Sequence, residues 1–389
     1  MFWLNFLHFY QPPTAADDQI HEVVKSSYQS WADFLIKHKN IKVTANFSGC
    51  LIERLFNMGY LKLLKQFSGL VRRGQLELVE SAAFHPLLPL LPEKEIIKQI
   101  RINHDINRSR LGAVYSPQGF FLPEMAYSPA VGEIIGRFNY HYLILDQIAL
   151  TGSIKDPIDN GDHYKIKNSE LMVVFRDRKL SQSFVPKAID LHSIKNKNAN
   201  EVIITATDGE LYGHHYWNWW LPYARVIKNR KITTATLSEY FKSPRAIKEI
   251  VPCPSSWESS EKELKKGVPF ALWYNPKNKI HQLLWQLANF ALELNYANIN
   301  DQDHFSARLH LEKGLASCTF WWASGRDFEL FGAPAWHPEE IEKGALELLR
   351  SVRSLKSVDA VIKIKAEKMF LAVHQAVWFK HWREKLAGK

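Results

Sequence analysis

Two carboxylates that each follow an apolar run have the clearest chemical potential in this sequence. Glu124 lies in "GFFLPEMAYSP" (119–129), where Pro123 favours a strand that ends with the carboxylate at its rim. Asp208 ends the β-branched run "EVIITATD" (201–208) and precedes a glycine. Taken singly, a solvated or capping carboxylate and an ordinary Asp-Gly turn explain both residues. Facing each other, they would form the pair that glycosidic chemistry requires: one nucleophile, and one acid that then acts as a base.

Histidines and further carboxylates accompany this pair. His8, in "LHFYQPP", could hydrogen-bond a substrate hydroxyl or be satisfied by neighbouring backbone. The proline-rich stretch 74–92, "GQLELVESAAFHPLLPLLP", contributes Glu77, Glu80 and His85. Strand alternation directs Glu77 and Glu80 to opposite faces, so one of them is expected to be a surface carboxylate.

A divalent-metal site is the main alternative for the same residues. Asp208, His214 and His215, joined by His8 or His85, could bind a metal that activates water. Because His214 and His215 are adjacent, their side chains would point to opposite faces of a strand or about 100° apart on a helix. We therefore expect neither a metal nor a cofactor. The motifs G-x-x-x-x-G-K-[ST], G-x-G-x-x-G and G-x-S-x-G, which would indicate nucleotide binding or a serine hydrolase, do not occur either.

Seven short β-type runs must position these residues. Between the first five lie helical stretches at 20–38, 51–67, 94–111 and 129–137, an order typical of a parallel sheet buried on both faces. About seven such units predict a barrel rather than a small open sheet. The runs are "FWLNFLHF", "KVTANF", "QLELVE", "GFFLPE", "HYLILD", "LMVVFRD" and "EVIITATD".

Polar residues end these runs. In a β/α barrel the carboxyl ends of the strands and the loops after them form the active-site face. One polar ending is ordinary solvation, whereas seven in register indicate a common site. The endings are His8, Asn46, Glu77 with Glu80, Glu124, Asp146, Arg176 with Asp177, and Asp208.

The C-terminal third reads differently. After about residue 265 the pattern changes to helix only, as in the amphipathic stretch 280–292. The stretch 250–268 has the composition of a linker. We therefore predict a catalytic barrel over residues 1–265 and a helical domain over residues 266–389, packed on the barrel.

Composition limits the classes of partner. The 389 residues are 46% hydrophobic, enough for a sizeable core, and the net charge of +10 is dispersed rather than clustered as a nucleic-acid site would require. No run approaches the ~18 apolar residues of a membrane span, and the three cysteines are scattered. We expect a soluble, cytoplasmic protein without nucleic-acid or membrane partners. The chain has thirteen tryptophans, several of them clustered at 216–220 and 320–324, and their flat faces suit the stacking of sugar rings.

Five of these stretches, taken in order, resemble the sequence regions of glycoside hydrolase family 57, whose members act mostly on α-glucans. They are "LHFYQPP", "GQLELVES", "GFFLPEMAYS", "ATDGELYGHH" and "TATLSEYF", spaced over residues 8 to 241. The C-terminal "LASCTFWWASGRDFELFGAPAW" is similar to the family's helical region. The resemblance implies an α/β fold, an incomplete (β/α)7 TIM-like barrel followed by a C-terminal α-helical region. It also implies a retaining mechanism through a covalent glycosyl-enzyme.

The resemblance implies roles for single residues. Glu124 would be the nucleophile and Asp208 the general acid/base. Tyr10 stands where the first region often has a second histidine, and Phe121 where the third often has tryptophan. Both departures bear on substrate specificity, because these positions shape subsites. The residues expected to bind or support the substrate are His8, Tyr10, Glu77, His85, Trp273, Trp321 and Trp322.

The expected activity is hydrolysis of an α-glucan oligo- or polysaccharide, as in an α-amylase. A 4-α-glucanotransferase or branching enzyme is the alternative, because water and an acceptor sugar attack the same intermediate. Alternatives of another class are a metal-dependent barrel hydrolase resembling a deacetylase and a non-catalytic sugar-binding barrel. The sequence makes no prediction of the oligomeric state.

Overall fold

A computed structural model describes most of the chain. The described residues form two compact units, which we treat separately. The first unit comprises Met1–Gln11, Ala15–Ala83 and Leu88–Leu264; the second comprises Pro12–Thr14, Phe84–Leu87 and Lys265–Lys389. The described residues are 1–195, 198, 200–214, 216, 218–229, 231–325, 327–328, 333–334 and 336–386.

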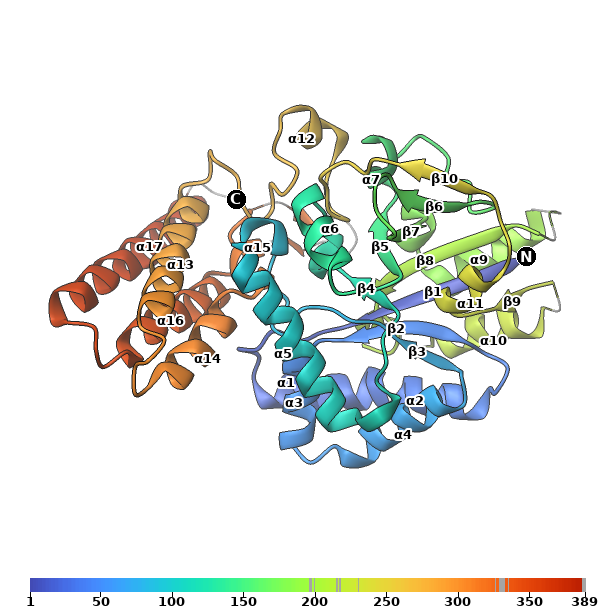
Figure 1. Cartoon of the computed structure of the whole chain (residues 1–389), viewed down its shortest axis with the longest axis horizontal. Coiled ribbons are helices and arrows are strands. Elements are labelled where there is room, and N and C mark those ends of the chain that lie inside the picture. The colour runs from blue at the N-terminus through green and yellow to red at the C-terminus, as the bar shows by residue number, and fades with distance from the viewer. Residues whose placement is uncertain are drawn as a thin grey trace. The chain divides into compact units, whose positions relative to one another are not determined.

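Seven parallel strands form a barrel in the first unit, which confirms the predicted fold class (Figure 1). Two hydrogen-bonded sheets meet at their edges. Glu80 and Phe120 form a parallel bridge on one side, and the Asp177 amide donates to the Ile204 carbonyl at 2.8 Å on the other. The strands, in barrel order, are β1 (Phe2–Phe9), β2 (Val43–Phe47), β3 (Leu76–Leu78), β4 (Gly119–Phe121), β5 (Tyr142–Asp146), β7 (Met172–Arg176) and β8 (Val202–Asp208).

Strand alternation separates two hydrophobic clusters. Along β1, Leu4 and Phe6 belong to the cluster inside the barrel, whereas Trp3 and Leu7 belong to the cluster between the strands and the outer helices. The strands are apolar on both faces because both faces are covered. On the same alternation His8 follows Leu4 and Phe6 toward the barrel interior.

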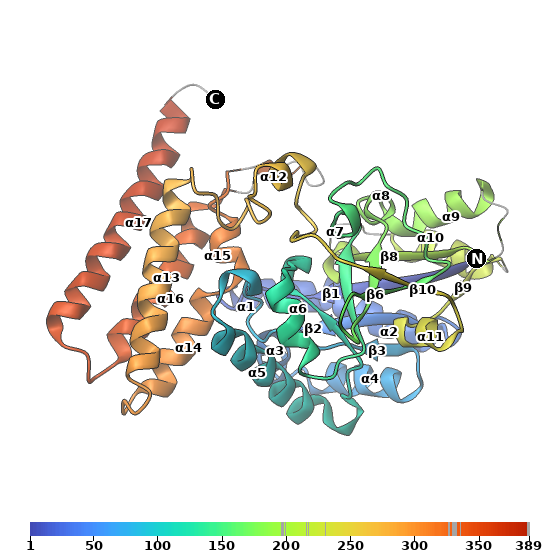
Figure 2. The same ribbon diagram turned by 45° about the horizontal axis from the view of Figure 1, so that its top comes forward.

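Helices cover the outside of the strands (Figures 1 and 2). The single helix predicted over 51–67 is wrong: the chain breaks around Gly59, whose φ of 85° a helix does not accommodate, and the second helix runs on to Arg72. The helices of this unit are α1 (Asp17–Val23), a π-helical turn η1 (Val24–Tyr28), α2 (Gln29–Lys37), α3 (Gly49–Asn57), α4 (Leu61–Arg72), α5 (Glu93–Leu111), α6 (Pro129–Gly136), α7 (Ile148–Thr151), α8 (Arg178–Ser181), α9 (Val185–Lys195), α10 (Trp220–Lys228) and α11 (Leu237–Lys242).

Three short strands extend the barrel sheets. β6 (His163–Ile166) pairs antiparallel with β7, and β10 (Ile247–Ile250) pairs parallel with β6. β9 (Thr233–Thr234) pairs parallel with the start of β1. The chain then passes through the segment 251–260 to α12 (Glu261–Lys265).

The second unit is mainly helical. The expectation of helix alone after residue 265 is wrong in detail, because β11 (Asp327–Phe328) and β12 (Ala333–Pro334) form a short antiparallel pair. The helices are α13 (Lys279–Ala297), α14 (His304–Gly314), α15 (Ser317–Trp321), α16 (Pro338–Ser354) and α17 (Ala360–Leu386).

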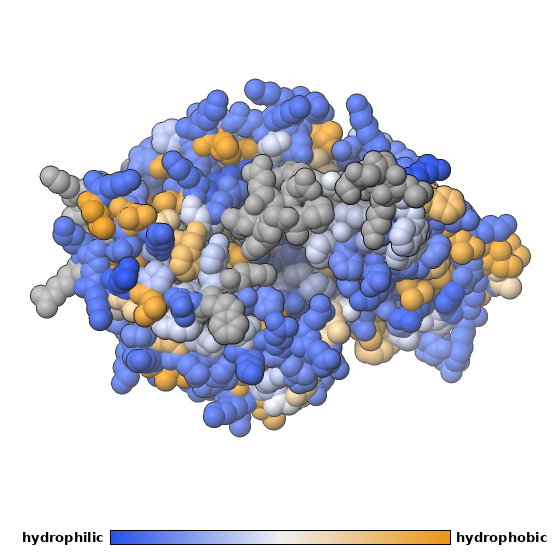
Figure 3. Space-filling view, turned by 180° about the vertical axis from the view of Figure 1, so that it is seen from behind, coloured by the Kyte–Doolittle hydropathy of each residue, from blue (hydrophilic) through white to orange (hydrophobic). Residues whose placement is uncertain are grey.

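The face seen in Figure 3 is largely hydrophilic, and hydrophobic residues appear on it as small groups among hydrophilic ones. None of the helices in the described part of the chain is both long and apolar enough to cross a bilayer.

Candidate active site

Glu124 occupies a strained turn directly after β4. The turn is η4 (Pro123–Met125), and both Glu124 and Met125 adopt left-handed backbone angles, with φ of 60° and 48°. Non-glycine residues in this region each cost about 1–3 kcal/mol and persist only where surrounding structure imposes them. The Trp257 amide donates to the Glu124 carbonyl at 3.1 Å, and Tyr127 and Ser255 exchange two backbone hydrogen bonds. The neighbouring segment therefore fixes the turn.

The Glu124 carboxylate is oriented by the same segment. The indole N–H of Trp257 donates to Glu124 Oε2 at 2.9 Å. The Trp257 ring lies among three other side chains of the barrel interior: the His8 and Phe121 rings, each with a centroid distance of 6.0 Å, and the Arg176 guanidinium at 5.1 Å. Trp257 thus joins Glu124 to residues at the ends of β1, β4 and β7.

Asp208 ends β8 on the interior face. Its Cα pairs with that of His8 on β1, and alternation places it on the side of Ile204 and Ala206, which belong to the interior cluster. Burial raises the pKa of Asp208 to about 6; the Arg176 charge opposes this shift and the Glu258 charge adds to it. A carboxyl with a raised pKa can hold a proton closer to neutral pH than an ordinary aspartate.

His8 is buried and neutral in this setting. Its Nδ1–H donates to Asn46 Oδ1 at 2.9 Å, and burial lowers its pKa to about 4. Its ring stacks near Tyr10, with a centroid distance of 5.9 Å, and packs against Phe121 at 4.7 Å. Asn46 therefore sets the orientation of an uncharged imidazole at the carboxyl ends of the strands.

Glu210 is a third carboxyl here, and no sequence pattern predicts a role for it. It lies in η5 (Gly209–Leu211), two residues after Asp208, and is 7% exposed. The Tyr28 hydroxyl donates to its Oε1, as does the Tyr10 amide at 3.3 Å. Burial first, and then the Asp208 charge, raise the pKa of Glu210 to about 8. Its position two residues beyond a strand-end aspartate was the available signal.

Known proteins of one family are similar to this chain. The family model of glycosyl hydrolase family 57 matches residues 7–251. The chain belongs to this family. An alpha-amylase of Pyrococcus horikoshii is 27% identical over 66% of this chain, and a 4-alpha-glucanotransferase of Thermococcus litoralis is 28% identical over the same share. The matched regions cover 43% and 42% of those two relatives, so the chain spans less than half their length.

Solved family 57 structures share the fold. The 4-alpha-glucanotransferase of Thermococcus litoralis superposes with a TM-score of 0.70 and 20% identity, over 92% of this chain and 59% of that one. A branching enzyme from Pyrococcus horikoshii gives a TM-score of 0.64 at 17% identity, over 97% of this chain and 96% of that one. The (β/α)7 barrel with a helical C-terminal region, implied by the family resemblance, is therefore confirmed.

Glu77 and Glu80, the two carboxylates of the stretch "GQLELVES", lie away from Glu124 and Asp208. Glu77 is at the amino-terminal side of the barrel interior, where it accepts hydrogen bonds from Thr44, Tyr142 and Ser238. Glu80 is fully buried, with Asn103, His104, Tyr115 and Tyr140 donating to it. The expectation that one of the two glutamates is a surface carboxylate is thus wrong, because Glu77 faces the barrel interior and Glu80 is enclosed by partners that include Asn103 and His104 of α5.

The remaining predicted substrate residues lie in the second unit. His85 is buried, has a φ of 55°, and shares a hydrogen bond with Ser317 Oγ at 2.9 Å. Trp273 is only 1% exposed, so its ring offers no open face to a sugar. Trp321 and Trp322 are partly exposed and pack edge-on at 4.4 Å; their role as stacking residues stays a prediction.

The alternative metal site has no ligand group among the residues that the structure describes. No cluster of three or more His, Cys, Asp or Glu side chains there is arranged to hold a metal ion. His214 lies near Ser26 Oγ and Glu22, and His215 is outside the described residues.

The stretch 250–268, whose composition predicts a linker, includes the segment 255–259, which is part of this site. Trp257 donates to Glu124, and the Glu258 charge raises the pKa of Asp208. A tryptophan within a serine-rich stretch was the one signal available, because a linker rarely needs an indole.

Proposed function

We propose that this protein is a retaining glycoside hydrolase or transglycosylase that acts on α-glucans. Hydrolysis is the first expectation, with 4-α-glucanotransfer or branching as the alternative. One observation carries the proposal: Glu124, in a strained turn, and Asp208, with a pKa of about 6, are both linked to Trp257 and its neighbours. Membership of family 57, whose relatives include alpha-amylase and 4-alpha-glucanotransferase, supports it.

The two carboxyls divide the reaction. Ionised Glu124 attacks the anomeric carbon while protonated Asp208 gives its proton to the leaving oxygen, forming a covalent glycosyl-enzyme. Asp208, now ionised, takes a proton from water or from an acceptor hydroxyl, which displaces Glu124 and retains the configuration. The Trp257 N–H keeps the nucleophile oriented, and neutral His8 serves as a hydrogen-bonding partner for a substrate hydroxyl.

Replacing Glu124 tests the nucleophile. We expect E124A to lose turnover of maltoheptaose by at least about 10⁴-fold, because no covalent intermediate can form. Azide should restore release of the leaving group from an activated α-glycoside and yield a β-glycosyl azide, identified by NMR. E133A, which changes an exposed glutamate on the neighbouring α6, is the matched control and should keep normal activity. Near-normal activity of E124A would overturn the assignment.

Product analysis separates the alternatives. Maltoheptaose is incubated with and without EDTA, and the products are resolved by chromatography. Shorter products alone mean hydrolysis, additional longer ones mean transfer, and branched ones mean branching. Loss of activity in EDTA would favour the metal-dependent hydrolase, and binding without turnover would favour a sugar-binding barrel.

We also propose a cytoplasmic location, which the scattered cysteines of the sequence support.

A further inference from the structure

A buried cluster of one aspartate and two arginines lies beside the catalytic residues without belonging to them. The Asp146 cluster consists of Asp146, which ends β5, Arg176, which ends β7, and Arg178, which begins α8. Arg176 Nε donates to Asp146 Oδ2 at 2.6 Å, and Arg178 Nε donates to Oδ1 at 2.7 Å. All three residues are at most 7% exposed.

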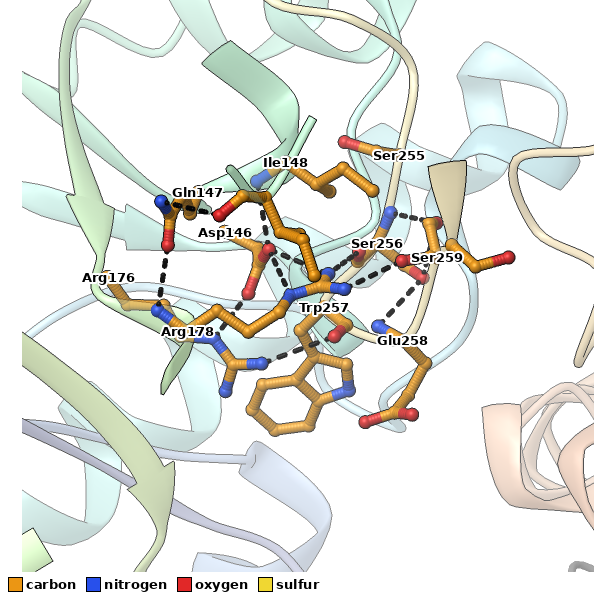
Figure 4. Close-up of polar contacts among 12 residues, drawn as sticks. Asp146, Gln147, Ile148, Arg176, Arg178, Ser255, Ser256, Trp257, Glu258 and Ser259 are labelled. Carbon is orange, nitrogen blue, oxygen red and sulfur yellow. Dashed lines mark hydrogen bonds and ion pairs between the residues drawn. The ribbon is translucent and has the colours of Figure 1, made fainter. Parts of the chain in front are cut away.

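The arginines direct their other N–H groups at the segment 255–259. Arg176 donates to the Trp257 carbonyl at 3.2 Å, and Arg178 donates to the carbonyls of Ser256 at 3.2 Å and Ser259 at 2.7 Å (Figure 4). The segment has no regular secondary structure, so these carbonyls lack the partners that a helix or sheet would give them; within the segment the Ser256 carbonyl accepts a backbone hydrogen bond from the Ser259 amide at 3.2 Å. The arginines supply further partners, and Asp146 holds both arginines in place.

A chain of contacts therefore leads from the cluster to Glu124. The cluster holds the carbonyl side of the segment, and the segment's Trp257 donates its amide to the Glu124 carbonyl and its indole N–H to the Glu124 carboxylate. The strained turn of Glu124 needs such external support. Stability alone explains the cluster poorly, because burying three charges costs more desolvation than ion pairing commonly returns.

We propose that Asp146, Arg176 and Arg178 are positioning residues that hold the segment 255–259 where Trp257 orients Glu124. The inference rests on the proposed function for its kinetic consequence, and on the contacts alone for its structural one. Arg178 gives the cleaner test, because Arg176 also acts on Asp208. Lysine at position 178 keeps the charge, but one ammonium group cannot bind Asp146 and two separate carbonyls together.

The experiment compares R178K and D146N with wild type by hydrogen–deuterium exchange and by kinetics on maltoheptaose. We expect faster exchange in peptides covering 253–260 and 122–128, with wild-type rates in β1 and β8. We also expect kcat to fall at least about tenfold with little change in KM, since a misplaced nucleophile weakens only the transition state. Asparagine has nearly the shape of aspartate, so D146N allows the same measurements if R178K does not fold.

R110K is the matched control. Arg110 forms a bidentate pair with Glu53 in the same unit, at 2.8 and 3.0 Å, away from the Asp146 cluster, so its replacement should leave kcat unchanged. Wild-type exchange at 253–260 in both cluster variants would overturn the inference, as would faster exchange throughout the barrel or a raised KM at normal kcat. If wild-type protein does not act on glucans, the proposed function fails, while the exchange data still decide whether the cluster holds the segment.

Discussion

Two charged neighbours shift the pKa of Asp208 in opposite directions. Arg176 on β7 lowers the pKa and Glu258 on the segment 255–259 raises it, while burial sets the overall upward shift to about 6. Glu210 follows the end of β8, and His8 is paired with Asp208 near the end of β1, so both lie at the carboxyl ends of the strands. In the proposed mechanism Asp208 acts first as an acid and must be protonated, so we predict that activity falls as pH rises through its pKa.

Replacing Glu258 by glutamine should move that fall to lower pH. Removing a negative charge favours the ionised form of Asp208, so its pKa drops. We expect the alkaline limb of kcat/KM on maltoheptaose to shift down by about 0.5 pH unit in E258Q, because this limb reports the free enzyme. E133Q serves as control and should keep the wild-type profile. If the alkaline limb of E258Q stays in place or moves to higher pH, the Glu258 charge does not raise the pKa of Asp208.

Glu210 makes a different prediction, for stability. The pKa of Glu210 in the folded protein, about 8, lies above its ordinary value of 4.5. The neutral carboxyl therefore stabilises the folded protein fully below pH 4.5, and this contribution is lost as pH rises toward 8. E210Q cannot ionise. Its free energy of unfolding relative to wild type should therefore grow between pH 4.5 and 8, by on the order of 5 kcal/mol, and then level off. Urea denaturation at several pH values measures this; a pH-independent difference would contradict it.

At the scale of elements, Glu77 joins four parts of the barrel. Its carboxylate on β3 binds Thr44 on β2, Tyr142 on β5 and Ser238 on α11. We predict that E77Q lowers the free energy of unfolding by about 2–4 kcal/mol, since an amide leaves some of these donors unsatisfied. The KM of the folded variant should stay near wild type. A raised KM with unchanged stability would instead support the substrate-binding role expected from the sequence.

The strands were predictable because each is a short apolar run with a polar end. All seven barrel strands fall within the expected runs, and His8, Asp146, Arg176 and Asp208 end them on the interior face. Periodicity carries this information locally. The support of Glu124 by the segment 255–259 was not predictable, because it depends on Trp257 meeting a turn 133 residues away in the chain. No local pattern encodes such a partner.

At the scale of the whole molecule, we propose that the barrel of residues 1–265 and the helical region of residues 266–389 are separate folding domains. The helical compact unit also includes two short segments from the N-terminal part of the chain, Pro12–Thr14 and Phe84–Leu87. Separate domains should respond separately to a local disturbance of their packing.

Two glycine substitutions test this separation. In G344A the new Cβ on α16 would lie 2.2 Å from Thr319 Oγ1 on α15, so helix packing must give way at a cost of about 1–3 kcal/mol. We expect faster hydrogen–deuterium exchange in peptides of α13, α15 and α16, with β1 and β8 unchanged. G69A on α4 is the matched control: its Cβ meets no described atom within 4 Å, so the barrel should keep or gain up to about 1 kcal/mol. If G344A also loosens β1 and β8, the two units unfold as one cooperative system, because a disturbance confined to α16 then costs the barrel its protection.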